Sequence, residues 1–397
     1  MQEYKSDDYV IQVHDSWQTV DAAAWNALLA QQATPTPFMQ HAYLQAMELS
    51  QAASPDTGWG LQIVTLSQSC EAPGASALRL CAATALYLKG HSYGEYVFDW
   101  AWADAYQRHG LRYYPKALVA VPFTPVPGSR LLAVDTAARL ALAQALIEIT
   151  QTQARSSLHL LFGDDADLQA CTQAGMMLRH TVQFHWHNAN FTDFDDFLSH
   201  LSQDKRKKIR QERRKVEQAG VQFRVLRGSQ IQAQDWDFFY RCYERTYLEH
   251  GNKPYLSRDF FARMQHTQAE HWLLFVGEMQ GRPMACSLLG LNSEAPGGGV
   301  AYGRYWGALE RVDCLHFEAC YYQPIAWCIA NGFVRFEGGA QGEHKMARAL
   351  LPVQTSSAHW LSHPGFADAV ARFLAQEGQG VQAYLEDLTQ RSPLKQG

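Results

Sequence analysis

Strand-like and helix-like patterns of apolar residues alternate along this chain. Residues 78–90 form a long, almost unbroken apolar run, which is typical of a strand inside a sheet. Residues 16–50 instead place Trp17, Leu28 and Leu29 on one helical face, with a break at the prolines of 34–37. The same patterns predict helices at 99–109, 136–154, 165–175, 194–219, 235–249 and 257–266, and strands at 59–66, 158–162, 180–187 and 221–226.

The last part of the chain continues the mixture of strands and helices. The pattern predicts a hairpin at 271–278 and 283–291, strands at 300–306, 333–337 and near 359–361, and two C-terminal helices. Between the strands at 300–306 and 333–337 we expect a helix that is capped by Asp313 and kinked by Pro324. The whole order is that of an α/β protein with mixed sheets.

Two stretches repeat the same order of elements. Tyr93-Gly-Glu-Tyr96 follows a long strand and precedes a helix, and Tyr302-Gly-Arg-Tyr305 does the same in the second half. A chain of 397 residues also exceeds the usual size of one hydrophobic core. We therefore expect two related α/β halves, a first domain at residues 1–190 and a second domain at 191–397.

Composition narrows the class of protein. Charged residues make up 18% of the chain and the net charge is -5, which indicates a globular protein without a general attraction to nucleic acid. The eight cysteines form no CxxC pair, and we expect reduced thiols in a cytoplasmic protein. The N-terminus is acidic where a signal peptide is basic, and no apolar run reaches the roughly 18 residues of a membrane span. His185 and His187 share a strand face, but no further ligand lies at suitable spacing, so we expect no metal.

One helix carries a dense run of positive charge. Residues 205–215 contain eight lysines and arginines in eleven positions. Such a run is usually a solvated helix face. It is also the one segment whose charge could contact tRNA, a nucleotide-linked lipid or a phosphorylated substrate.

The segment 333–348 has the strongest chemical character. A short strand ends at Glu337, two glycines follow, and Glu343, His344, Lys345 and Arg348 then fall within a few residues. Glu343, His344 or Glu337 could act as a general base, and Lys345 and Arg348 could clamp a phosphate or carboxylate. The alternative is a solvated turn with charge pairs.

Two further groups of residues are candidates for substrate binding or catalysis. In the first half these are Lys89, Ser92, Glu95, Tyr114 and Lys116, which lie between an apolar strand and the next strand. They could line a groove, or their acids could simply cap a helix. In the second half, Tyr302 and Arg304 alternate on a strand with Trp306 on the same face, where Arg304 could bind an anion.

Several long motifs give a resemblance to a known family. They are Tyr302-Gly-Arg-Tyr-Trp-Gly307, Leu315-His-Phe-Glu-Ala-Cys-Tyr321, Phe336-Glu-Gly-Gly-Ala-Gln-Gly-Glu-His-Lys345, Lys89-Gly-His-Ser-Tyr-Gly-Glu-Tyr-Val-Phe-Asp99 and Tyr113-Tyr-Pro-Lys116. In these stretches the chain resembles the bacterial FemAB-like proteins of peptidoglycan biosynthesis or recognition, which belong to the GNAT superfamily of acyltransferases. The resemblance spans roughly residues 30 to 390 and implies two tandem GNAT-like domains.

The resemblance also implies an activity. It is the transfer of an acyl or aminoacyl group to an amine of a small molecule or peptide, with no tightly bound cofactor. The donor would be acyl-CoA or an aminoacyl-tRNA. The nearest match to the usual coenzyme A loop of GNAT enzymes, Arg304-Tyr-Trp-Gly307-Ala-Leu309, ends in leucine and lies largely in a strand, which leaves both donors open. A Fem-type ligase and a binding protein that has lost catalysis are the alternatives.

Overall fold

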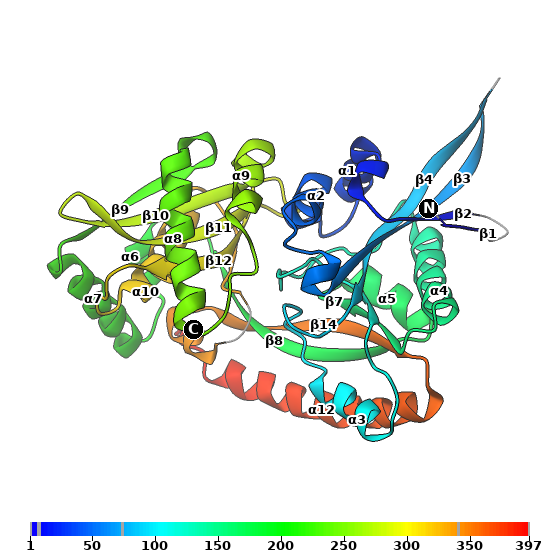
Figure 1. The fold of residues 1–397 in the computed structure, drawn as a ribbon. Coiled ribbons are helices and arrows are strands. Elements are labelled where there is room, and N and C mark those ends of the chain that lie inside the picture. Colours follow the sequence, from blue (N-terminus) through cyan, green and yellow to red (C-terminus); the bar gives the residue numbers. More distant parts are fainter. Residues whose placement is uncertain (1, 6–8, 73–74, 340–341, 396–397) are drawn as a thin grey trace. The chain divides into compact units, whose positions relative to one another are not determined.

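The computed structural model describes residues 2–5, 9–72, 75–339 and 342–395, and Figure 1 follows the course of the chain. The chain forms two compact units, of which unit 1 comprises Met1–Thr181 with Thr355–Val381 and unit 2 comprises Val182–Gln354 with Gln382–Gly397. The first unit thus includes a late segment that we expected in the second domain. Three elements pass from one unit into the other: strands β8 (Met177–His187) and β14 (Leu351–Leu361) and the helix α12 (Pro364–Gln390).

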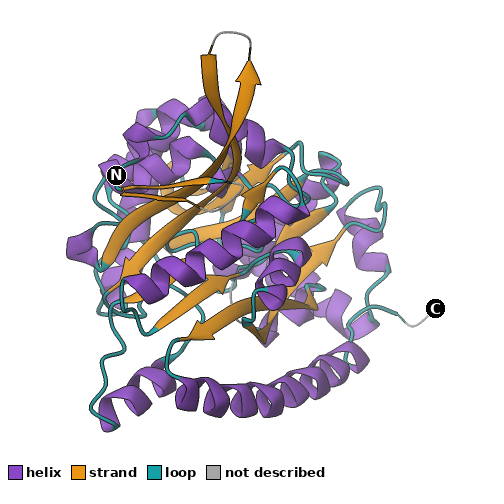
Figure 2. Ribbon diagram, turned by 90° about the vertical axis from the view of Figure 1, so that its right-hand side faces the viewer, coloured by secondary structure: helices purple, strands orange, loops and turns teal. Residues whose placement is uncertain are grey.

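Unit 1 is built on a mixed sheet. Its strands are, in spatial order, β1 (Gln2–Lys5), β2 (Val10–His14), β3 (Trp59–Ala72), β4 (Ala75–Lys89), β5 (Lys116–Val119), β7 (Ser157–Leu161) and the end of β14, and β6 (Leu132–Ala133) pairs with β4. Neighbouring strands are antiparallel from β1 to β5, and then β5 and β7 run parallel. The long hairpin of β3 and β4 is conspicuous in Figure 2.

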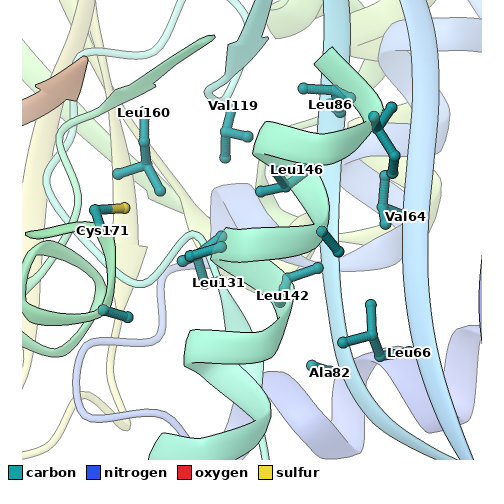
Figure 3. Packing of buried hydrophobic residues seen from close by; sticks show 14 of the residues in the cluster. Val64, Leu66, Ala82, Leu86, Val119, Leu131, Leu142, Leu146, Leu160 and Cys171 are labelled. Carbon is teal, nitrogen blue, oxygen red and sulfur yellow. The ribbon is translucent and has the colours of Figure 1, made fainter. Parts of the chain in front are cut away.

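Helices cover the sheet of unit 1. They are α1 (Ala22–Ala30), α2 (His41–Leu49), α3 (Trp100–Arg108), α4 (Thr136–Thr152), α5 (Asp165–Gln173) and the first part of α12. The Asp135 side chain caps α4 by accepting a hydrogen bond from the Ala138 amide at 2.8 Å. The apolar face of α4 then packs Leu142 and Leu146 against buried strand residues such as Leu86 (Figure 3). This packing is the core of unit 1.

Unit 2 contains a second mixed sheet. Its strands are, in spatial order, β9 (Val221–Arg227), β10 (Trp272–Met279), β11 (Arg282–Asn292), β12 (Val300–Ala308), β13 (Arg335–Glu337) and the end of β8. Its helices are α6 (Phe194–Ser199), α7 (Gln203–Gln218), α8 (Ala233–Glu249), α9 (Arg258–Thr267), α10 (Leu315–Phe317) and α11 (Gln323–Ala330), with a π turn at Glu318–Tyr322 and a 3-10 helix at Glu343–Arg348. The expected mixed α/β class is therefore confirmed.

The two sheets repeat one topology. In unit 1 the order is β2, two helices, β3, β4, β5, the helix α4 and β7, and in unit 2 it is β9, two helices, β10, β11, β12, the helices α10 and α11, and β13. Unit 1 differs in having the helix α3 between β4 and β5 and the short strand β6 before α4. Three antiparallel pairings and then one parallel pairing occur in each unit. The residue match behind our expected repeat was wrong, however. Tyr302 lies inside β12, whereas Tyr93 lies in the loop after β4, at a different place in the topology.

Some predicted boundaries differ in the structure, for local physical reasons. Cys314, in the left-handed region at φ 67, occupies the position before the α10 helix in place of Asp313. Pro324 stands in the first turn of α11, directly after the π turn Glu318–Tyr322, and its missing amide is tolerated there. The two C-terminal helices are one helix, α12. Within the described residues no helix combines the length and the apolar character that crossing a membrane requires.

Candidate active site

The parallel pair β12 and β13 of unit 2 places two predicted catalytic residues side by side. Tyr302 is the register partner of Glu337, at the last paired position of the two strands. β12 continues to Ala308 beside β11, whereas β13 ends at Glu337. Among the described residues, the backbone of β12 beyond Tyr302 therefore has a ladder partner on the β11 side alone.

Glu337 is a buried carboxylate with an incomplete set of partners. Its Oε1 lies 2.9 Å from Arg335 Nε, and its buried Oε2 has no hydrogen-bond partner among the residues that the structure describes. His185 Nε2 lies 3.9 Å from the same Oε2. Burial raises the pKa of Glu337 to about 7, against the opposing effect of Arg335. Such a carboxylate can take up a proton near neutral pH.

Tyr302 is buried beside this carboxylate. Burial, and then the charge of Glu337, raise the pKa of Tyr302 above its ordinary value, so its phenol stays protonated. Tyr302 can therefore donate a hydrogen bond or a proton, but cannot act as a base at neutral pH.

Arg304 does not occupy the position that we expected. Leu288 and Leu289 of β11 face Tyr305 and Gly303, so Arg304 is the extra residue of a β-bulge. The bulge interrupts the alternation of faces, which puts Tyr302 and Trp306 on opposite faces and not on one. Arg304 donates to the Tyr305 hydroxyl at 3.1 Å.

The predicted charge cluster after the glycines divides into two residues that form ion pairs, Glu343 and Arg348, and two that do not, His344 and Lys345. It forms a 3-10 helix that begins after Gly342, whose φ of 122° favours glycine. Glu343 is exposed and pairs with Arg391 at 2.7 Å. Arg348 is buried and pairs with Glu212 at 3.0 Å. Both side chains are thus in charge pairs with residues outside the cluster, and the Arg348 guanidinium already pairs with Glu212.

Lys345 and His344 have a different setting. Lys345 is buried, and its ammonium donates to the Gly339 carbonyl at 3.0 Å. Burial lowers the pKa of Lys345 to about 8, with the nearby thiol of Cys320 acting in the opposite direction. His344 is exposed and lies 3.4 Å from the Tyr321 hydroxyl, and burial and Lys345 lower its pKa. These two residues keep their place as candidates.

The π turn contributes residues that we did not predict as a group. Cys320 and Tyr321 come from this turn, and π turns are frequent at functional sites. Burial raises the pKa of Cys320 to about 12, and a hydrogen bond from Ser287 and the charge of Lys345 oppose this shift. A sequence signal for the turn was absent, because the residues 318–322 continue an ordinary helical pattern.

Unit 1 brings together the five first-half candidates. Lys116 Nζ donates to Glu95 Oε2 at 2.7 Å and to Ser92 Oγ at 2.8 Å, and it also contacts Asp99. Ser92 lies 2.8 Å from the Tyr114 hydroxyl. Lys89 is the cross-strand neighbour of Lys116, since they face each other on β4 and β5.

The network of unit 1 extends through Tyr113 and Asp99 to His159 and His359, two histidines that we did not predict. Tyr113 donates to Asp99 at 2.6 Å and lies 3.2 Å from His159 Nε2. His159 Nδ1 in turn lies 2.7 Å from His359 Nδ1. Burial is the largest influence on both histidines and lowers their pKa values. No grouping of three metal-ligating side chains occurs in the part of the chain that the structure describes.

Comparison with solved structures finds similarity at low sequence identity. A conserved protein of unknown function from Bacteroides thetaiotaomicron VPI-5482 superposes with a TM-score of 0.51 at 9% identity, covering 89% of this chain and 100% of its own. L-PGS from Bacillus licheniformis has a TM-score of 0.49 at 10% identity, covering 89% of this chain and 97% of its own. A tandem GNAT protein from the clavulanic acid biosynthesis pathway has a TM-score of 0.43 at 10% identity, covering 89% of this chain and 99% of its own.

Family membership follows from the sequence as a whole. A comparison with curated proteins found no match. The family model FemAB-like, described as peptidoglycan biosynthesis/recognition, matches residues 16–396, which is nearly the full length and includes both units. The chain therefore belongs to the FemAB-like family.

Proposed function

We propose that this protein is an N-acyltransferase of the GNAT/FemAB type, which transfers an acyl or aminoacyl group to an amine of a small molecule or peptide. The observation that supports this most is Glu337, a buried carboxylate with one open oxygen at the point where β13 ends and β12 continues. Family membership supports a donor of the acyl-CoA or aminoacyl-tRNA class.

The proposed reaction assigns a role to each group. Glu337 accepts a proton from the ammonium of the acceptor, and the free amine attacks the carbonyl carbon of the donor. Backbone N–H groups of β12 beyond Tyr302 stabilise the oxyanion that forms. The C–S or C–O bond of the donor then breaks, and the leaving group takes a proton from Tyr302, which recovers it from Glu337. Glu337, ionised again, takes the second proton of the nitrogen and releases it to solvent. The new C–N bond is an amide.

Calorimetric titration of the full chain tests the identity of the donor. We expect coenzyme A or an acyl-CoA to bind, and an acceptor amine to be acylated with loss of activity in Glu337→Gln. Absence of binding by coenzyme A, acetyl-CoA and longer acyl-CoAs, together with full activity of Glu337→Gln on another donor, would contradict the mechanism.

A Fem-type aminoacyl-tRNA-dependent ligase acting on a peptidoglycan precursor is the second candidate. It is favoured by α7, where Lys207, Lys208 and Arg210 are exposed. Charge reversal at these three positions should then abolish a tRNA affinity that falls steeply with salt. A binding protein without catalysis is favoured by the ion pairs of Glu343 and Arg348, and it predicts ligand binding without turnover.

We also propose a cytoplasmic location. The described cysteines are all free thiols, and most of them are buried, as in proteins from reducing compartments. Fractionation of cells that express a tagged chain tests this.

A further inference from the structure

Lys89 of unit 1 is a buried cation without a carboxylate of its own. It is fully buried at the end of β4, opposite Lys116 on β5, and like charges in facing positions of neighbouring strands repel each other. Its ammonium donates to the Tyr93 carbonyl at 3.3 Å and lies 3.7 Å above the ring of Trp59. Burial lowers the pKa of Lys89 to about 7. The ammonium therefore has donors left for an anionic or carbonyl oxygen.

Glu95 lies close to Lys89, and one of its carboxylate oxygens lacks a hydrogen-bond donor among the described residues. Its Oε2 accepts from Lys116, but its Oε1 is buried and has no hydrogen-bond partner. Among the described residues no ion pair joins Glu95 to Lys89, although the charge of Glu95 raises the pKa of Lys89 more than any other group does. A donor group brought to Oε1 would satisfy this buried oxygen.

The neighbouring side chains Lys116 and Asp99 have their hydrogen bonds satisfied and hold Glu95 in position. Lys116 contacts Ser92, Glu95 and Asp99. Both oxygens of Asp99 are occupied, one by Ser92 at 2.5 Å and the other by Tyr113 and Lys116. Within the described part of this network, the open positions are the Lys89 ammonium, Oε1 of Glu95 and the buried indole N–H of Trp59. Buried polar groups are usually paired, so these three groups point to a ligand.

The charges of the cluster determine the class of ligand. Lys89 and Lys116 balance Glu95 and Asp99, so a ligand with a net charge would leave one charge uncompensated in a buried place. A ligand with one negative and one positive end meets both open groups at once. The cover over them is a loop, since Tyr93 belongs to the residues between β4 and α3 and its side chain is 60% exposed.

We propose that unit 1 has a binding site for the α-amino acid group, in which Lys89 binds the carboxylate and Glu95 binds the ammonium. The ring of Trp59 and the backbone carbonyl of Tyr93 border it. The site requires no catalysis in unit 2, so it stands apart from the transferase proposal.

Ligand-observed NMR on the full chain tests this site. The probes are glycine, L-alanine, L-lysine and L-phenylalanine, together with acetate, methylammonium and N-acetylglycinamide, which each lack one end or both charges. We expect at least one amino acid to bind, and the three partial probes to bind at least ~10-fold more weakly, because each leaves a buried charged group unpaired. Equal binding of acetate, or no binding of any amino acid, overturns the proposal.

Variants connect the binding to these residues. Glu95→Gln and Lys89→Met should each weaken the amino acid at least ~10-fold. Asp104→Asn, at an exposed position of α3, is the matched control and should leave the affinity unchanged. Unchanged affinity in both site variants overturns the proposal, and if a variant does not fold, the partial probes on the wild-type chain still decide. Glu337→Gln should keep amino acid binding, which separates this site from the transferase mechanism.

Discussion

Glu337 and Tyr302 face each other at the last register position of the parallel strands β13 and β12. Parallel neighbours in register point to the same face of a sheet, so a carboxylate that holds a proton near pH 7 lies beside a phenol that keeps its own. Burial raises both pKa values, which leaves a base that titrates near neutral pH beside an acid that keeps its proton, as general acid–base catalysis requires.

Replacement of Glu337 tests its role as the base. We expect Glu337→Gln to lower kcat/KM by ~100-fold or more, because glutamine cannot accept the proton of the acceptor. Glu343→Gln is the matched control, since Glu343 is exposed and paired with Arg391, and it should change the rate less than ~2-fold. The measurement is initial rate with the donor and acceptor found for the wild-type chain. The reverse order of effects would move the base to the 3-10 helix.

The pH dependence of the rate follows from the same carboxyl group. Because Glu337 must be ionised to accept a proton and burial raises its pKa to about 7, kcat/KM should rise as pH increases through about 7. With an ordinary glutamate the rise would come near pH 4.5. Rate profiles from pH 5 to 9 check this, and a flat profile across pH 6 to 8 argues against Glu337.

Stability should change with pH in the opposite sense. The pKa of Glu337 is raised from 4.5 to about 7 on folding, so the folded state binds its proton more tightly than the unfolded state. Stability from this group is therefore complete below pH 4.5 and is lost as pH rises to about 7. We expect Glu337→Gln to equal the wild type at pH 4 and to exceed it by on the order of 1–3 kcal/mol at pH 8, measured by urea unfolding.

Much of the fold was accessible from sequence because it depends on local patterns. Periods of two and of 3.6 residues located most strands and helices, and the glycines after residue 337 marked a strand end beside a polar cluster. The ion-pair partners of that cluster could not be predicted from the sequence. Arg348 pairs with Glu212, which is 136 positions away, and no local pattern indicates such a pair.

Single-residue insertions into a strand or a helix could not be predicted from the sequence either. The bulge at Arg304 adds one residue to a strand, and the π turn adds one residue to a helical turn. Each shifts the side chains that follow, while leaving the hydrophobic pattern intact. This is the reason that Tyr302 and Trp306 were wrongly assigned to one face.

The buried pair of Arg348 and Glu212 is expected to be structural. Arg348→Met should destabilise the protein by about 3–5 kcal/mol, because it leaves the Glu212 carboxylate buried without its cation. The double variant Arg348→Met with Glu212→Leu should recover a large part of this loss. Thermal and urea unfolding measure both. A stable single variant with impaired ligand binding would instead assign Arg348 to substrate binding.

Gly307 separates a packing role from a role in binding coenzyme A. A Cβ at this position would lie 2.2 Å from the Cys242 carbonyl oxygen of α8, which is backbone and cannot rotate away. We therefore expect Gly307→Ala to lower the free energy of unfolding by at least ~1–3 kcal/mol, the usual cost of overpacking a core. Gly378→Ala in α12, where a Cβ meets nothing within 4 Å, should instead stabilise by about 0.5–1 kcal/mol. If Gly307→Ala keeps full stability and loses coenzyme A affinity, Gly307 belongs to a phosphate-binding loop after all. Loss of stability alone leaves it as the contact that lets β12 approach α8.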